Sequence, residues 1–450
     1  MATTLTLNDP LPIEKENIIM VKPSQPTPSP ILSLSTIDND PNIELICQTI
    51  YVYKSNETSD QDDKLDPASI IKQGLEKALV EYYPLAGRIK RHHEDNKLRV
   101  KCNGEGVPFL RARTTCTLSS LNYLYNISID IAKKFVLEFE SKSEDGVHPL
   151  MFQVTRFSCG GFTVGMGLSH SICDGFGASQ FFRSVAELAA GKEELSVKPV
   201  WERERLVANS THEPIHFPFH KDSLASSPHL PCNDLLHASF DVNAESIRKL
   251  KLSSNIMGFG SDTITTLEVL GAFVWRAKFR ALEMNLDGKT HFSLAMGLRN
   301  ILDPPLPKGY YGNAFIGSHV FMDGKDLCEG PLSKVAWAIK EGKKSAAAKE
   351  YLMPYLSTVE RFNQENKKLE AKGASTVLTD WRHMGLFEVD FGWKNSVNVV
   401  PVPWNMFGHV DLLIFLPPFS LDPAMKGGVR VLVCLPRVAM AKFKEEMGSL

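Results

Sequence analysis

The spacing of hydrophobic and polar positions changes along the chain. It shifts from the alternation typical of strands to the three-and-four spacing typical of helices. Runs of β-forming or alternating residues predict strands over 45–53, 98–102, 151–157, 162–169, 290–298, 387–391, 410–416 and 429–434. Apolar residues that recur on one face predict helices over 67–83, 181–189, 263–279 and 332–349, and a last helix from 437. This mixture predicts an α/β fold built of layers.

One long segment, 191–223, is charged, contains prolines and has little periodicity. Such composition is typical of a connection between domains. It predicts an N-terminal domain over 1–190, a crossover over 191–223 and a C-terminal domain over 224–450. The length of 450 residues agrees, because domains average roughly 150 residues. A chain of this size buries enough surface to fold without disulfides or a metal.

Charge and cysteine content exclude several classes of protein. Lys and Arg number 50 and Asp and Glu 52, which argues against a nucleic-acid surface or a basic membrane surface. The eight cysteines form no CxxC pair, so they indicate neither a zinc finger nor a thioredoxin-type motif. Residues 1–15 carry Asp9 and Glu14 and no apolar core of a signal peptide, and no 18-residue apolar run follows. We therefore expect a cytoplasmic protein that associates with neither nucleic acid nor membrane.

The most informative local pattern is a short polar turn between a predicted strand and a predicted helix, with His170, Asp174 and Gly175 on it. A histidine at a strand end can reach into a cleft and act as a general base near neutral pH. A carboxylate four residues later can orient the ring or brace the turn. A purely structural reading is equally open at this point, with Asp174 as a helix N-cap and His170 as a hydrogen-bonded core residue.

Two further motifs are near misses. The stretch 167–171 resembles the G-x-S-x-G nucleophile elbow around Ser169, but Ser171 stands where the elbow needs glycine. The stretch 212–216 matches H-E-x-x-H, yet Pro214 within it disfavours the helix on which two histidines would bind one zinc. We therefore predict no metal site, and we expect 212–216 to be part of the crossover.

Five segments, taken in order, resemble the plant BAHD acyltransferase family. They are Leu34-Ser-Thr-Ile-Asp38, Tyr83-Pro-Leu-Ala-Gly-Arg88, His170-Ser-Ile-Cys-Asp174-Gly, Gly309-Tyr-Tyr-Gly-Asn313 and Asp390-Phe-Gly-Trp-Lys394. The third corresponds to the family's HxxxDG motif and the last to its DFGWG motif, with lysine in the final place. The residues around Gln25-Pro-Thr-Pro, Val154-Thr-Arg-Phe and Asn313 are most similar to those of taxane acyltransferases and benzyl alcohol benzoyltransferases.

This resemblance implies a fold and a reaction. The fold is two chloramphenicol-acetyltransferase-like domains, each a mixed sheet with flanking helices, joined by a long crossover loop and separated by a tunnel. The reaction is acyl transfer from acyl-CoA, a co-substrate, to an acceptor hydroxyl of a small plant metabolite, with an amine as the alternative. His170 would be the base, and no acyl-enzyme would form. The resemblance also implies a monomer with no permanently bound cofactor.

The resemblance also assigns residues. It implies that Asp174 forms a structural ion pair with Arg299, and that Asp38, Gly175, Thr379 and Trp381 line the substrate pocket. Trp381 or Thr379 would serve the oxyanion.

The DFGW residues Asp390, Phe391, Gly392 and Trp393 would be structural and lie near the CoA entrance. Lys394 departs from the motif. If the family's glycine has a positive φ, lysine there is strained; otherwise Lys394 lies on the surface or pairs with a CoA phosphate.

Two other classes of function remain open from the sequence. One is a catalytically silent binding protein on the same fold, with Lys394 as its only support. The other is a hydrolase that uses Ser169. The sequence alone leaves both the acceptor and the acyl-CoA donor unidentified.

Overall fold

The computed structural model describes residues 11–55, 66–139, 144–209, 211–215, 223–253, 263–368, 373–403 and 411–450. Its strands are β1 (Ile13–Lys15), β2 (Ile19–Val21), β3 (Ile31–Ser33), β4 (Ile46–Tyr53), β5 (Arg88–Arg91), β6 (Leu98–Lys101), β7 (Val107–Thr114), β8 (Leu150–Phe157), β9 (Phe162–Ser169), β10 (Leu235–Val242), β11 (Lys289–Gly297), β12 (Phe315–Asp323), β13 (Ser375–Asp380), β14 (Asn398–Val402), β15 (Asp411–Leu416) and β16 (Val429–Pro436). Its α-helices are α1 (Pro67–Glu81), α2 (Ile129–Ala132), α3 (Gly175–Ala189), α4 (Ala244–Ser253), α5 (Thr266–Ala281), α6 (Gly324–Glu329), α7 (Leu332–Ala346), α8 (Leu352–Gln364) and α9 (Arg437–Gly448).

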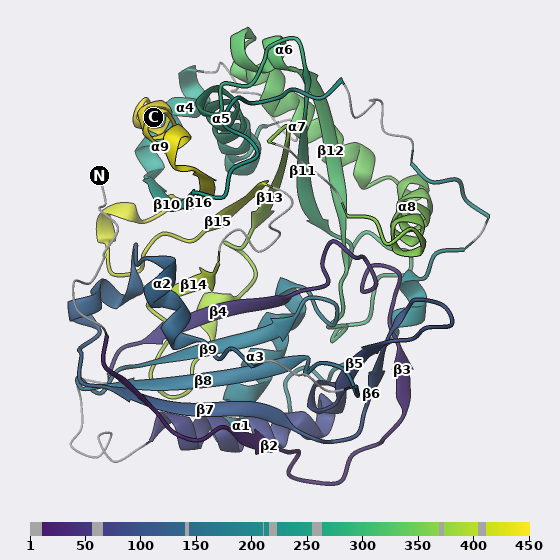
Figure 1. Ribbon diagram of the computed structural model, residues 1–450, viewed down its shortest axis with the longest axis vertical. Helices are drawn as coiled ribbons and strands as arrows, with labels where there is room; N and C mark the ends of the chain where they lie inside the picture. Colours follow the sequence, from purple (N-terminus) through teal and green to yellow (C-terminus); the bar gives the residue numbers. More distant parts are fainter. Residues whose placement is uncertain are drawn as a thin grey trace.

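Two large mixed sheets form the two halves of the molecule (Figure 1). The first has the order β1-β7-β8-β9-β4-β14, and β2 also pairs with β7. The second has the order β10-β16-β15-β13-β11-β12, and a small sheet, β3-β6-β5, flanks the first. Helices α1 and α3 pack together against the first sheet, and α5, α7 and α9 pack against the second. The predicted α/β fold of two mixed sheets with flanking helices is confirmed.

The helices follow local signals in the sequence. Helix α1 begins where Asp66 caps it and Pro67 occupies its first turn, which is where a proline fits. Its apolar face lies against α3 at Gly74. A Cβ on this glycine would lie 2.5 Å from the Val185 carbonyl oxygen, so the two helices approach too closely for any side chain there.

One strand of the first sheet comes from the predicted C-terminal domain. Strand β14 pairs antiparallel with β4, with Val399 opposite Tyr51. Arg430 of β16 donates to Asn398 Oδ1 (2.9 Å) and to the Val399 carbonyl oxygen (3.2 Å), so the second sheet is tied to the same strand. Strand β14 therefore belongs to the first sheet although it lies within the predicted C-terminal domain. The domain limits 1–190 and 224–450 stay a prediction.

Most predicted elements have counterparts, but the predicted strand over 387–391 is wrong. A short 3-10 helix, η9 (Leu386–Glu388), begins there, and an irregular segment follows. Val389 and Phe391 are buried in the first half of the molecule, so their alternation comes from packing rather than from strand pairing.

The crossover holds a 3-10 helix, η5 (Arg203–Leu206). Of the H-E-x-x-H stretch, 212–215 lie in this crossover and His216 lies outside the described residues.

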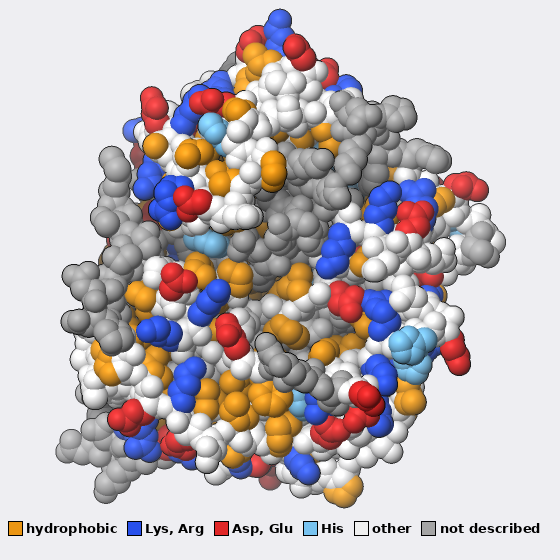
Figure 2. All heavy atoms as spheres, viewed as in Figure 1, with side chains coloured by type: hydrophobic (Ala, Val, Ile, Leu, Met, Phe, Trp, Pro, Cys, Tyr) orange, Lys and Arg blue, Asp and Glu red, His pale blue; other side chains and the backbone are white. Residues whose placement is uncertain are grey.

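The surface mixes the two signs of charge. In Figure 2, acidic and basic side chains are interspersed over the visible face, and hydrophobic side chains gather in its lower half. Within the described ranges, no helix combines the length and the apolar character needed to cross a bilayer.

Candidate active site

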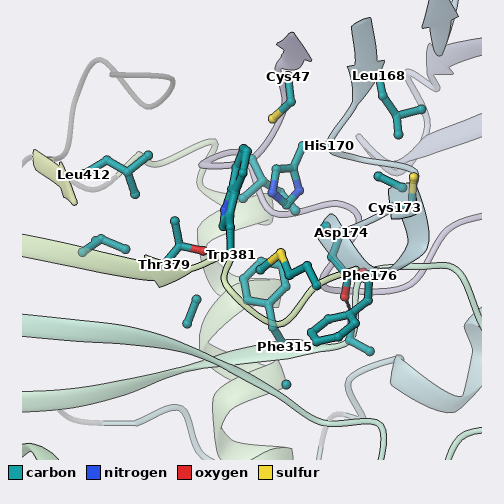
Figure 3. A pocket seen from close by; sticks show the side chains of 18 of the residues that line it. Cys47, Leu168, His170, Cys173, Asp174, Phe176, Phe315, Thr379, Trp381 and Leu412 are labelled. Atoms are coloured by element: carbon teal, nitrogen blue, oxygen red, sulfur yellow. Dashed lines mark hydrogen bonds between the residues drawn. The ribbon is translucent and has the colours of Figure 1, made fainter. Parts of the chain in front are cut away.

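A cavity of about 240 Å³ lies between the two halves. The first half contributes the β4 and β9 strand ends and the 170–175 turn, and the second contributes β11, β12 and β13 (Figure 3). Its wall is mostly apolar, and small residues such as Ala295 and Gly297 keep it open on the side of the second sheet. A pocket of this kind, with a few converging polar groups, is typical of a small-molecule site.

His170 follows the last residue of β9 and lines this cavity. Its backbone is held on both sides. The His170 amide donates to the Leu45 carbonyl oxygen (2.9 Å), and its carbonyl accepts from Asn313 Nδ2 (2.6 Å). Phe315 of β12 meets the imidazole edge-on, with the ring centroids 5.9 Å apart. The turn therefore presents the imidazole to the cavity in a fixed position.

The environment keeps this imidazole neutral. Burial lowers the pKa of His170 below its usual value, because the charged form loses water. Its own carbonyl, Asp174, Asn313 and Asp38 raise the pKa in part, but the net shift is downward. A neutral imidazole at pH 7 can accept a proton, which a general base must do.

Asp174 and Arg299 form the ion pair that the resemblance implied. Arg299 Nη1 and Nη2 each donate to the Asp174 carboxylate at 2.8 Å. The same carboxylate accepts from the amides of Gly177 (2.9 Å) and Ala314 (3.0 Å). Asp174 is therefore also the N-cap of α3, so the structural and functional readings of this residue coexist. Its oxygens are used to join the turn to the second half of the molecule.

Asp38 does not line the cavity, so its expected place in the substrate pocket is wrong. It is completely buried behind the 170–174 turn. Its carboxylate lies 3.2 Å from Arg203 Nε and accepts from the backbone amide (3.1 Å) and Nδ2 (2.7 Å) of Asn313. A buried carboxylate requires such partners, and they leave it no path to substrate.

Thr379, Trp381 and Gly175 do line the cavity. Thr379 and Trp381 project from the end of β13 and the turn after it, and the Trp381 amide donates to the Phe415 carbonyl oxygen at 2.8 Å (Figure 3). Gly175 leaves room for Met384, whose sulfur would lie 2.4 Å from a Cβ on this glycine. These groups share the cavity with His170.

The Asp390–Lys394 segment packs elsewhere. The ring of Phe391 contacts Phe182 and that of Trp393 contacts Phe162 in the core of the first half. None of the five motif residues lines the cavity. Asp390 Oδ1 accepts from the Gly392 amide at 2.7 Å, which closes a tight turn. Lys394 is exposed and has a φ of 63°, the left-handed conformation that favours glycine.

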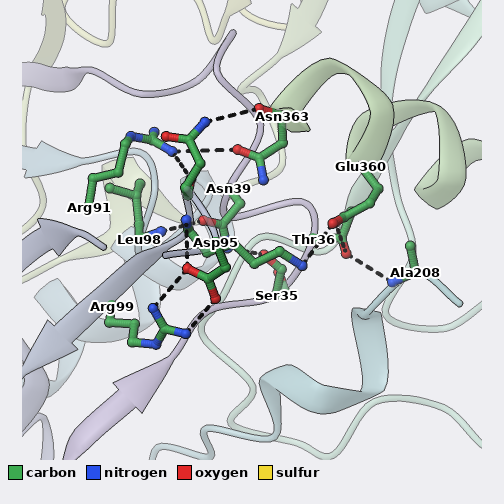
Figure 4. A network of polar contacts seen from close by, with 12 residues as sticks. Ser35, Thr36, Asn39, Arg91, Asp95, Leu98, Arg99, Ala208, Glu360 and Asn363 are labelled. Atoms are coloured by element: carbon green, nitrogen blue, oxygen red, sulfur yellow. Dashed lines mark hydrogen bonds and ion pairs between the residues drawn. The ribbon is translucent and has the colours of Figure 1, made fainter. Parts of the chain in front are cut away.

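The loop that carries Asp38 is anchored to three elements (Figure 4). Thr36 Oγ1 donates to Glu360 of α8 (3.3 Å) and accepts from the Ala208 amide of the crossover (2.9 Å). Asn39 Oδ1 accepts from the Leu98 amide of β6 at 2.7 Å. Both halves of the molecule and the crossover therefore fix this loop behind the turn.

Ser169, the residue on which the hydrolase reading depends, is buried at the end of β9 and does not line the cavity. A serine nucleophile must meet its substrate, so this placement argues against a serine hydrolase.

Comparison with known proteins places the chain in a family. Residues 11–450 match the Transferase family. The chain belongs to this family, the BAHD acyltransferases. Its fold is also that of vinorine synthase, with a TM-score of 0.75 at 21% identity over 98% of both chains. TRI101 of F. sporotrichioides, solved with coenzyme A and T-2, has a TM-score of 0.71 at 16% identity over 93% of this chain and 97% of that one.

Curated relatives at higher identity are plant acyltransferases, so this protein is an acyltransferase too. A spermidine coumaroyl-CoA acyltransferase of Arabidopsis thaliana is 42% identical over 98% of this chain and 96% of the relative. A 3'-N-debenzoyl-2'-deoxytaxol N-benzoyltransferase of Taxus canadensis is 34% identical over 97% of this chain and 96% of the relative. The predicted likeness to taxane acyltransferases is confirmed. The greater likeness to a spermidine enzyme was not anticipated.

Proposed function

We propose that this BAHD acyltransferase moves an acyl group from acyl-CoA directly to a hydroxyl of a small plant metabolite, with His170 as the general base. The observation that carries the proposal is the neutral, fixed imidazole of His170 in a mostly apolar cavity between the two halves of the molecule. Its surroundings in both halves of the molecule suit a ternary complex in which acyl-CoA and acceptor are held together.

The chemistry balances without an acyl-enzyme. His170 takes the acceptor hydroxyl proton while the oxygen attacks the thioester carbonyl carbon. The tetrahedral oxyanion then collapses, the carbon–sulfur bond breaks, and the departing CoA sulfur receives the proton from the imidazolium. Trp381 or Thr379 stabilises the oxyanion, because both line the same cavity as the base. The enzyme works as a cytoplasmic monomer with acyl-CoA as its co-substrate and no resident cofactor.

An amine acceptor is the second candidate, and the relatives favour it. Two Arabidopsis proteins named as spermidine coumaroyl-CoA and spermidine sinapoyl-CoA acyltransferases are each 42% identical to this chain. On that basis we propose spermidine as acceptor and a hydroxycinnamoyl-CoA as donor for the amine form of the reaction. The same base then removes the proton from the nitrogen after it has attacked the carbonyl.

A mass-spectrometric endpoint assay tests the proposal. Purified protein and its His170→Ala variant receive a panel of acyl-CoAs with a mixed pool of plant alcohols and spermidine. Products that form only with the intact protein establish the transfer and identify both substrates. Equal activity of His170→Ala removes His170 as the base. Retained CoA binding without turnover of any donor favours the silent binding protein.

Product stability and pH dependence distinguish the two acceptors. Mild alkali cleaves an ester and leaves an amide intact. With a hydroxyl acceptor, kcat/KM rises with pH through the pKa of His170 and then levels off. With spermidine it continues to rise, because only a neutral amine attacks and alkyl ammonium groups deprotonate near pH 10.

A further inference from the structure

A buried arginine of the crossover lies directly behind the catalytic turn. Arg203, in η5, is 1% exposed. Its guanidinium carbon lies 4.3 Å from the Trp201 ring centroid, 5.1 Å from that of Tyr310 and 4.9 Å from that of Tyr311. Gly312 completes this aromatic cage, because a Cβ there would lie 1.3 Å from Arg203 Nη1. Arg203 belongs to none of the motifs in the sequence, and it does not line the cavity.

The cage holds a full charge away from water, which is costly unless an opposite charge accompanies it. Asp38 supplies that charge. Its Oδ2 lies 3.2 Å from Arg203 Nε and also accepts from the Ser35 amide at 3.0 Å. Burial alone lowers the pKa of Arg203, but Asp38, together with Tyr310 and Tyr311, raises it above its usual value. The pair is therefore a matched charge pair inside the protein.

This pair holds the backbone that carries His170. Arg203 Nη2 donates to the Ile172 carbonyl oxygen at 2.8 Å. Asp38 Oδ1 holds Asn313 through its amide and Nδ2, and the same Nδ2 donates to the His170 carbonyl oxygen at 2.6 Å. The carbonyls of His170 and Ile172 thus accept hydrogen bonds from Asn313 and Arg203, and both of these donors contact the Asp38 carboxylate. We propose that Arg203 is a positioning residue that fixes the His170 turn and balances the charge of Asp38 beside the base.

The charge balance has a measurable consequence. Asp174 and Asp38 are the carboxylates whose charge acts on His170, and each is matched by one arginine, Arg299 and Arg203. Loss of the Arg203 charge leaves Asp38 uncompensated and favours the protonated imidazole. Nearby unit charges move a pKa by about one unit or more in protein interiors.

Other titratable groups that line the cavity contribute little charge near neutral pH, because burial lowers the pKa of His319 to about 4 and raises the pKa of Tyr51 and Tyr355. The thiols of Cys47 and Cys173 line the same cavity, and burial raises the pKa of both. They therefore stay uncharged over the pH range in which His170 titrates.

The test uses three variants of the full chain: Arg203→Met, Arg203→Lys and Asp38→Asn. Rates of CoA release are measured from pH 5 to 9 at saturating and limiting acyl-CoA. In Arg203→Met the acid limb of kcat/KM moves up by about one pH unit, while KM for acyl-CoA is unchanged, since Arg203 lies outside the cavity. Arg203→Lys keeps the charge and leaves the limb in place. In Asp38→Asn the limb moves down, because the Arg203 charge is then unmatched.

An NMR titration of the His170 ring, assigned by the signal lost in His170→Ala, reads the same pKa without substrate. An unshifted pKa in Arg203→Met overturns the proposal. If Arg203→Met does not fold, Asp38→Asn decides, and an unshifted or raised pKa there overturns it. The inference rests on His170 as the base. A fully active His170→Ala variant refutes that function, whereas a fixed ring pKa across the charge variants refutes the role of Arg203 alone.

Discussion

Replacing Lys394 with glycine should stabilise the protein without changing its turnover. Lys394 has a φ of 63°, and an L-residue in this conformation costs roughly 1–2 kcal/mol. Glycine removes that strain but gives the unfolded chain more freedom, at a cost of about 0.5–1 kcal/mol. The net gain is then about 0.5–1 kcal/mol, which corresponds to a rise in melting temperature of about 1–4 °C for a folding unit of roughly 150–250 residues.

The assay is thermal unfolding of the full chain, with Lys394→Ala as the matched control. Alanine removes the same long side chain but keeps the Cβ in the strained conformation, so it should stay within about 0.5 kcal/mol of the parent. A glycine variant no more stable than the alanine variant would refute the strain argument. A large gain in turnover for glycine would refute the structural role of the motif. A raised KM for acyl-CoA in both variants would instead show that Lys394 pairs with a CoA phosphate.

Three further predictions follow from the site and its surroundings. Arg299→Met, which leaves the mostly buried Asp174 without the two 2.8 Å contacts that hold it, should lower the unfolding free energy by about 3 kcal/mol and reduce kcat more than it raises KM, as chemical denaturation and steady-state kinetics can show. Ala295→Phe narrows the cavity, so kcat/KM should fall at least about tenfold for hydroxycinnamoyl-CoA donors and much less for acetyl-CoA; an equal loss for both would contradict the assignment of this wall to substrate. Burial lowers the pKa of His148 and His319 to about 4, so between pH 6.5 and 4 these histidines bind protons in the unfolded chain but not in the folded one. Urea titrations should therefore show that the free energy of unfolding falls by about 1.4 kcal/mol per pH unit for each histidine as the pH is lowered from 6.5 to 4.

Elements with a strong local pattern could be predicted from sequence. The hairpin β8–β9 combines two apolar runs with a glycine turn, and α3 shows a clear apolar face. Strand β14 was missed, because Pro401 and Pro403 lack a backbone amide and so disfavour a strand in a local reading of the sequence. In the structure β14 is an edge strand, where a proline costs no ladder hydrogen bond. The strand predicted over 387–391 is wrong for a different reason. Its apolar residues alternate because Val389 and Phe391 are buried in the core, and no strand in the described part of the chain pairs with them.

The site divides in the same way. His170, Asp174 and Gly175 form one contiguous motif, so their chemistry could be read from the chain. Arg203 has no local signal, because its partner Asp38 belongs to a distant segment and meets it only in the folded protein. The resemblance to the family placed Asp38 in the substrate pocket. The sequence could not correct this, because it shows that a carboxylate is present but not which way the side chain faces.

The membership of β14 in the first sheet has a consequence for recombining related enzymes. A chimera joined in the crossover would take its first sheet from one parent and the strand bordering β4 from the other. The segment 386–403 also supplies Phe391 and Trp393 to the first half's core, so such a chimera would carry mismatched side chains at that border. Chimeras that exchange substrate preference between relatives should therefore fold and function more often when the segment 386–403 and the N-terminal half come from the same parent. The structural half that could be exchanged between related enzymes is therefore encoded by two separate stretches of the gene.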